Sequence, residues 1–276
     1  MRWPERRVAM LQEMGIRLWL PPAVGVAEDP AQGVAGDLAG DQAERPAPAL
    51  PPPAVKVSAP AVRVAPVSAP PVAPALTVPG PRPEGVAQMD WPALRAAVAG
   101  CTACGLCRGR QNTVFGVGNE RAHWMLVGEA PGQQEDQQGE PFVGKAGQLL
   151  DNMLRAVGLL RAEAPPEQQV FIANVLKCRP PGNRNPEPAE VAQCEPFLKR
   201  QVALVQPRII LAMGRFAVQS LLQTQDPIGR LRGRVHTYEG VPLIVTYHPA
   251  YLLRNPLDKA RSWEDLCLAR EVMQRQ

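Results

Sequence analysis

The stretch "HWMLVGEAPG" at residues 123–132 decides the fold, because a short apolar run ends abruptly in glycine, a carboxylate and proline. Three further runs share this character: "VFIANVLK" (170–177), "RIILAMG" (208–214) and "PLIVTYH" (242–248). Helical stretches separate the runs, at 145–158, about 187–205 and about 215–223. Strands that alternate with helices predict a parallel sheet covered on both faces. We therefore expect an α/β fold with a small central sheet of four parallel strands flanked by helices.

Unusual polar, glycine and proline residues follow each of these four runs. In open α/β sheets the working residues gather just beyond the carboxyl ends of the strands. The residues in these positions are Gly128 to Gly132, Asn174 with Lys177 and Cys178, Gly214 with Arg215, and His248 with Pro249. The sequence therefore predicts that a functional site lies along one rim of the sheet.

The first third of the chain has a different composition from the rest. Sixteen of the 32 prolines lie between Pro21 and Pro83. A segment this rich in proline and alanine cannot bury enough apolar surface to offset its ordering entropy. We expect residues 20–88 to be a disordered linker, residues 1–19 to be a short amphipathic peptide, and residues 89–276 to form the globular domain.

Composition excludes some classes of protein and leaves others open. The chain has 30 Lys and Arg against 26 Asp and Glu, so a polyanionic partner is permitted. It contains no run of about 18 apolar residues that would span a membrane, and charged residues interrupt any apolar signal-peptide core. We expect a cytoplasmic protein without membrane association.

Six cysteines in a cytoplasmic protein point to ligation rather than to disulfides. Cys101, Cys104 and Cys107 form a C-x2-C-x2-C pattern, Cys178 follows the second apolar run, and Cys194 lies sixteen residues later. A scattered site of four cysteines fits this spacing best, and four thiolates suit either zinc or an iron–sulfur cluster. For Cys107 and Cys267 we favour inert thiols.

The fragment "GEPFVGKAG" (139–147) matches the start of a phosphate-binding P-loop. A P-loop continues with Ser or Thr, whose hydroxyl coordinates magnesium, but Ala146 stands in that position. No acidic strand end supplies a second magnesium ligand. We therefore reject a nucleotide-hydrolysing P-loop.

Six motifs, taken together, resemble the family 4 uracil-DNA glycosylases, which carry an iron–sulfur cluster. They are "CTAC", "VFGVGN", "VGEAPGQQED", "GEPFVGKAGQLL", "ANVLKCRPPGNRNPEP" and "YHPAYLLRN", and they cover about residues 95–270. The resemblance implies an enzyme that releases uracil from DNA and leaves an abasic site, as in base excision repair. We favour a monofunctional enzyme because no Lys is placed as an obvious Schiff-base nucleophile. It also implies a [4Fe–4S] cluster on Cys101, Cys104, Cys178 and Cys194.

The resemblance assigns roles to three residues of the base pocket. Phe142 would stack on a uracil that has been flipped out of the DNA. Asn174 would read the base, because an amide can donate to uracil O4 and accept from N3–H. His248 would donate a hydrogen bond to O2 as negative charge develops on the departing base. We also assign Gly128 and Ala130, on the same rim, to substrate binding.

Two carboxylates are candidates for directing water or stabilising the cationic sugar. Glu129 lies on the predicted rim, and Glu135 is the second candidate. Better-known glycosylases of the superfamily have an Asp one position after Glu129, where this chain has Ala130.

Residues after His248 are expected to contact the DNA itself. Leu252 and Leu253 would form an apolar wedge that fills the gap in the base stack. Arg254 would contact phosphate, with help from other basic residues near the rim. These helpers are Lys145, Arg179 and Arg184.

The N-terminal peptide suggests a partner. Residues 6–22 resemble the peptide of the psi subunit that docks on the bacterial clamp loader, so we expect the clamp loader or another replisome protein as partner. We expect a monomer that acts on single- or double-stranded DNA containing uracil. The alternative is a non-catalytic iron–sulfur module that binds DNA and associates with the replication machinery.

Overall fold

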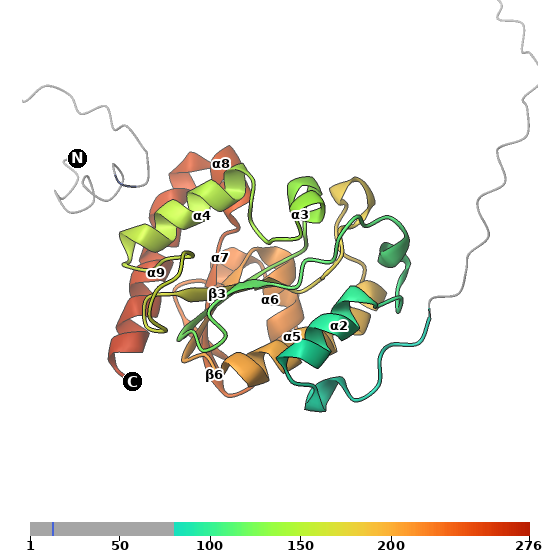
Figure 1. Cartoon of the computed structure of the whole chain (residues 1–276). Helices are drawn as coiled ribbons and strands as arrows, with labels where there is room; N and C mark the ends of the chain where they lie inside the picture. Colours follow the sequence, from blue (N-terminus) through green and yellow to red (C-terminus); the bar gives the residue numbers. More distant parts are fainter. Residues whose placement is uncertain (1–12, 14–79) are drawn as a thin grey trace, which may run out of the picture. The chain divides into compact units, whose positions relative to one another are not determined.

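The computed structural model describes Glu13 and residues 80–276 of the chain (Figure 1). The predicted partner peptide, apart from Glu13, and the predicted linker up to residue 79 lie outside the described residues. Within residues 80–276, none of the helices combines the length and the apolar character that a membrane span requires.

A six-stranded sheet with the order β1-β3-β2-β4-β6-β5 forms the centre of the domain. Its four inner strands are parallel and match the four apolar runs. They are β2 (Trp124–Gly128), β3 (Val170–Asn174), β4 (Ile209–Met213) and β6 (Val241–Thr246). Every residue of β2, β3 and β4 is buried, which explains why these strands read as continuous apolar runs.

The prediction of a four-stranded sheet is wrong at both edges, where an antiparallel strand is added. The short strand β1 (Val117–Gly118) pairs with β3, and β5 (Val235–Tyr238) pairs with β6. Strand β1 has only two residues, and β5 is largely exposed, so neither produces an apolar run in the sequence. Positive φ angles at Glu239 and Gly240 form the tight hairpin turn between β5 and β6.

Helices cover both faces of the sheet (Figure 1). One core packs Met125 and Val127 of β2 against one set of helices, and the other packs Trp124 and Leu126 against a second set. The first set is α2 (Trp91–Ala99), α5 (Pro188–Val205) and α6 (Arg215–Leu222). The second set is α4 (Lys145–Ala156), α8 (Pro249–Arg254) and α9 (Lys259–Gln274). The alternation of β2 side chains between the two cores is the period-two pattern of a strand buried on both sides.

Shorter elements complete the domain. Helices α3 (Gln133–Gln138) and α7 (Ile228–Leu231) carry loops near the carboxyl edge of the sheet. Four 3-10 turns are η1 (Val86–Gln88), η2 (Gly105–Arg108), η3 (Pro181–Asn183) and η4 (Pro256–Asp258).

The domain begins earlier than the sequence predicted. Residues 80–88 were assigned to the linker, but Val86 is buried in the core. The Gly80 amide donates to the Thr102 carbonyl at 3.0 Å. Asp90 then caps α2 by accepting from the Ala93 amide at 3.0 Å.

Candidate active site

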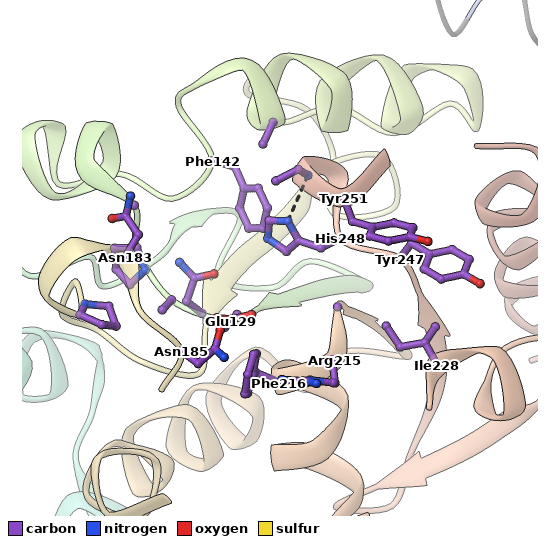
Figure 2. A pocket seen from close by; sticks show the side chains of 18 of the residues that line it. Glu129, Phe142, Asn183, Asn185, Arg215, Phe216, Ile228, Tyr247, His248 and Tyr251 are labelled. Carbon is purple, nitrogen blue, oxygen red and sulfur yellow. Dashed lines mark hydrogen bonds between the residues drawn. The ribbon is translucent and has the colours of Figure 1, made fainter. Parts of the chain in front are cut away.

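A pocket of about 850 Å³ lies at the carboxyl edge of the sheet (Figure 2). The segments after β2, β3, β4 and β6 all contribute to its walls. Seven of the predicted site residues line it: Glu129, Ala130, Glu135, Phe142, Asn174, His248 and Arg254. Segments far apart in the sequence are thus brought together at one rim, as the four apolar runs predicted.

Phe142 is held by two glycines. Its ring is buried and lies against the His248 imidazole, with centroids 5.3 Å apart and planes 27° from parallel. Its backbone is left-handed, with φ of 56°, which is uncommon for a bulky residue. A Cβ at Gly147 would collide with the Phe142 carbonyl, and a Cβ at Gly128 would collide with both the Phe142 ring and Asn174 Oδ1. Gly128 therefore makes room for two pocket residues, although it is not itself among the lining residues.

Asn174, the last residue of β3, presents a buried amide to the pocket. Its side chain is only 2% exposed, and its Oδ1 accepts no hydrogen bond within the described part of the chain. A buried acceptor without a partner costs about 1–3 kcal/mol. This arrangement is suited to a ligand that brings its own N–H group.

Lys177, which the sequence placed on the predicted rim without a role, is buried and supports the backbone of Asn174. Lys177 is fully buried, and its Nζ donates to the Asn174 carbonyl at 2.7 Å and to Gln201 Oε1 at 2.6 Å. Gln201 Nε2 in turn donates to the Phe115 carbonyl at 2.9 Å. Burial lowers the pKa of Lys177 to about 7. Nothing in the sequence separates this lysine from a surface cation, because its burial depends on α5 packing over it.

His248 sits at the start of α8 with a defined tautomer. Its Nδ1 accepts from the Ala250 amide at 3.1 Å, which is the dashed line in Figure 2. The ring proton of the neutral imidazole is therefore on Nε2. Burial, with a smaller contribution from the charge of Arg254, lowers the pKa of His248 to about 4. At neutral pH the residue is an uncharged hydrogen-bond donor.

The two candidate carboxylates have different surroundings. Burial raises the pKa of Glu129 to about 7, against the opposing charge of Arg215. Glu135 uses both oxygens within the protein, accepting from the Gly132 amide at 3.0 Å and from the Val143 amide at 3.1 Å. Glu135 therefore holds the loop that carries Phe142.

The two leucines of the predicted wedge differ in exposure, because they lie on different faces of α8. Leu252 is fully buried in the core beneath α8, so its assignment to substrate binding is wrong. Leu253 is 43% exposed. Successive residues of a helix point about 100° apart, so only one of two adjacent leucines faces outward here.

The predicted basic residues differ in their placement. Arg184 lines the pocket, but it forms an ion pair with Glu190. Lys145 and Arg179 are not among the lining residues. Arg215, which received no role from the sequence, does line the pocket, and its guanidinium lies 4.5 Å from the centre of the Phe216 ring. Further lining residues that sequence reasoning missed are Asn183, Asn185, Tyr247 and Tyr251. Each lies close in sequence to a predicted residue, which was the available signal.

The four predicted ligand cysteines have mixed exposure. Cys178 and Cys194 are buried, and Cys101 and Cys104 are partly buried. Burial raises the pKa of Cys178 and Cys104, and that of Cys194 to about 12. The charges of neighbouring thiols reinforce these shifts, so the four groups lie within electrostatic range of one another.

A cation stands beside one of these sulfurs. Arg110 donates to Cys178 Sγ at 3.1 Å and to the Cys101 carbonyl at 2.9 Å. Among residues 80–276, no three Cys, His, Asp or Glu side chains are arranged as a formed metal site. The donor chemistry of four neighbouring thiols, one facing a guanidinium, nevertheless fits a thiophilic metal or an iron–sulfur group.

Comparison with known proteins gives a consistent picture. Residues 115–269 match the family described as the uracil DNA glycosylase superfamily. The chain is 45% identical to the type-4 uracil-DNA glycosylase of Archaeoglobus fulgidus over 58% of this chain and 81% of that protein. It is 40% identical to the type-4 enzyme of Saccharolobus solfataricus (63% and 82% covered) and 42% identical to that of Thermotoga maritima (58% and 82%). The chain belongs to the uracil DNA glycosylase superfamily and, within it, to the type-4 family.

Proposed function

We propose that this chain hydrolyses the N-glycosidic bond of deoxyuridine in DNA, releasing uracil and leaving an abasic site for base excision repair. One observation carries the proposal: Asn174, whose buried Oδ1 has no hydrogen-bond partner in the described part of the chain, and the neutral, oriented imidazole of His248 line the same pocket. These two groups supply base recognition and leaving-group stabilisation respectively.

Base recognition depends on Asn174 being fixed. Its Oδ1 is free to accept from uracil N3–H, and its amide nitrogen can then donate to O4. Cytosine presents the opposite pattern, so both contacts would be mispaired at roughly 1–3 kcal/mol each. The bond from Lys177 to the Asn174 carbonyl holds the end of β3 in place. Phe142 gives the flipped ring an aromatic neighbour.

Cleavage depends on charge stabilisation. As the bond between the base and C1′ breaks, negative charge moves toward O2, where Nε2–H of His248 can donate. Water adds to C1′ of the cationic sugar and gives up one proton, through ionised Glu129 or solvent, and the released uracil anion takes up one proton in turn. Ionised Glu129 would orient that water or stabilise the cationic sugar. Leu253 would fill the gap in the base stack, and Arg254 and Arg215 would contact phosphates.

We further propose that Cys101, Cys104, Cys178 and Cys194 hold a [4Fe–4S] cluster. The support is the donor set, with four thiols in electrostatic range of one another and Arg110 beside Cys178. When bound, such a cluster would cross-link the segment before η2 to the end of β3 and to α5, besides offering one-electron chemistry. Measuring iron and acid-labile sulfide in anaerobically purified protein tests this, and stoichiometric zinc with no iron would contradict it.

We also propose that residues 6–22 recruit the enzyme to a replisome component such as the clamp loader. The support is the sequence of the peptide, with aliphatic and aromatic anchors at the end of a long proline-rich segment. Deleting residues 1–22 should leave uracil release from naked oligonucleotides unchanged and abolish binding to the purified clamp loader. A lowered Tm in the deletion variant would assign the segment to the domain instead.

The decisive experiment is a direct assay of base release. Purified protein is incubated with single- and double-stranded oligonucleotides that carry one uracil, and abasic sites are then cleaved with alkali. Cleavage at the uracil position, absent with thymine or cytosine there, supports the proposal. Tight binding without cleavage would favour a non-catalytic DNA-binding module.

A further inference from the structure

Two tyrosines flank His248 and stack on each other. Tyr247 follows β6 directly and Tyr251 lies on α8, and their ring centroids are 5.0 Å apart with planes 17° from parallel. Both rings line the pocket. Figure 2 shows them on the side of His248 that faces away from Asn183 and Asn185. The pocket wall therefore includes an aromatic pair, Tyr247 and Tyr251, beside the groups that would read and release the base.

Hydrogen bonds and core packing hold the two tyrosines next to His248. The Tyr251 hydroxyl donates to Asp258 Oδ2 at 2.7 Å, and Arg261 donates to the other oxygen of Asp258 at 3.0 Å. Asn255 Nδ2 donates to the Tyr251 carbonyl at 3.1 Å. Both rings also pack against the core formed with α4 and α9. Their orientation is thus set before any ligand arrives.

The pocket is larger than one base requires. Its volume of about 850 Å³ is in the upper part of the roughly 300–1,000 Å³ range of pockets that enclose drug-sized ligands. A single pyrimidine ring in contact with Phe142, Asn174 and His248 would leave part of this volume unfilled. The remaining space on the tyrosine side is bounded by Ile228, and Arg254 supplies a positive charge at the pocket wall.

We infer that Tyr247 and Tyr251 form a stacking platform for the base next to the flipped uridine on the same strand. Every base has a flat π-face, so such a platform binds single-stranded DNA without reading its sequence. Because the platform and His248 lie together within residues 247–251, a neighbouring base stacked on the platform would set the position of the uridine relative to Nε2–H. The inference rests on the proposed function, since it names how the same site holds the rest of its substrate.

The test varies the protein and the substrate together. Three single-stranded oligonucleotides each carry one uridine. In the first both neighbouring nucleotides are intact, in the second the 5′ neighbour is an abasic analogue, and in the third the 3′ neighbour is an abasic analogue. For the wild type we expect kcat/KM to fall roughly tenfold on one of the two analogues, as loss of one base–aromatic stack implies. Tyr247→Leu keeps apolar bulk against the core but removes the flat ring. The kcat/KM of Tyr247→Leu on the intact oligonucleotide should be about tenfold lower than that of the wild type. It should not fall further on the analogue that slows the wild type.

Matched variants separate stacking from folding. Tyr247→Phe keeps the ring and should keep the dependence on the neighbouring base, and Tyr251→Leu should reproduce the loss of that dependence independently. Equal kcat/KM of the wild type on all three oligonucleotides would contradict the platform. So would a Tyr247→Leu or Tyr251→Leu variant whose kcat/KM falls by the same factor on all three. If the wild type releases no uracil from the intact oligonucleotide, the proposed function fails. The platform is then decided by fluorescence-anisotropy binding of the same three oligonucleotides.

Discussion

The pocket and the cysteine region of this domain are organised in opposite ways. In the pocket, groups within the chain orient the functional residues: the Ala250 amide fixes the His248 tautomer, and Lys177 holds the Asn174 carbonyl. In the cysteine region, burial and mutual repulsion hold the thiol protons in place, as the raised pKa values of Cys104, Cys178 and Cys194 show. The groups of the first region are oriented by the chain itself, whereas on our proposal the thiols of the second would ionise when the cluster binds.

The largest expected effect concerns the cysteines. Cys178→Ser or Cys194→Ser should remove bound iron and lower stability by more than about 4 kcal/mol, which for a domain of this size lowers Tm by roughly 10 °C or more. Iron analysis and calorimetry measure both quantities. Cys107→Ser and Cys267→Ser are the matched controls and should keep iron and Tm. Full iron content in Cys178→Ser would show that Cys178 is not a ligand of the cluster and would contradict the proposed site.

The next effect concerns His248. His248→Asn removes the Nε2–H donor but keeps a side-chain oxygen that can accept from the Ala250 amide and so cap α8. We expect kcat for uracil release to fall about 10²–10³-fold, as for loss of one donor to a developing anion. Iron content should not change. A variant with wild-type kcat would show that the imidazole does not stabilise the leaving base.

A smaller effect follows from crowding the pocket. In Gly128→Ala the new methyl group would displace the Asn174 amide and the Phe142 ring together. We expect uracil release to fall at least about tenfold, or more than 1.4 kcal/mol in barrier. Gly109→Ala is the control, because a Cβ there meets nothing within 4 Å. Unchanged activity in Gly128→Ala would show that the pocket tolerates movement of both groups.

The smallest effect is a pH dependence of a few-fold that should follow Glu129. With its pKa raised to about 7, the carboxylate forms as pH rises through 7, so the rate should increase there. His248, with its pKa lowered to about 4, stays neutral across this range and should produce no inflection near 6.5. Glu129→Gln should therefore flatten the pH–rate profile. An inflection that persists in this variant would assign it to another group.

The same shift has a consequence for stability with a defined sign. The folded-state pKa of Glu129 lies above its unfolded value, so its contribution to stability is present below about pH 4.5 and is lost as pH rises through about 7. Glu129→Gln should accordingly raise Tm relative to the wild type at pH 8.5 more than at pH 5. A pH-independent difference between the two proteins would contradict the pKa shift.

The sequence predicted those parts of the fold that depend on strong local patterns. The four buried parallel strands and the helices α2, α4, α5 and α6 were predictable because each has an apolar run or periodicity of its own. Strand β1 has two residues and β5 faces solvent, so both exist because of their neighbours rather than their own sequence. Residues 80–88 looked like linker, although Val86 finds a place in the core.

The site was predictable to a similar degree. Glu129, Phe142, Asn174 and His248 converge because they follow strands that end at one edge. Lys177 was placed on the rim, but its role could not be predicted, since that role depends on Gln201 of α5, 24 residues later. Leu252 was misassigned because only the packing of α8 decides which of two adjacent leucines is buried. Contacts between distant segments account for both failures.

The crowding of Gly128, Phe142 and Gly147 restricts how this site can change over evolutionary time. Each glycine is required by the position of Phe142, and that position is stable only while both glycines lack a side chain. Substitutions at Gly128 and Phe142 should therefore be non-additive, since a smaller side chain at 142 would remove part of the clash that a Cβ at Gly128 meets. Gly147 faces the backbone carbonyl of residue 142, so this position should stay glycine whichever side chain stands at 142.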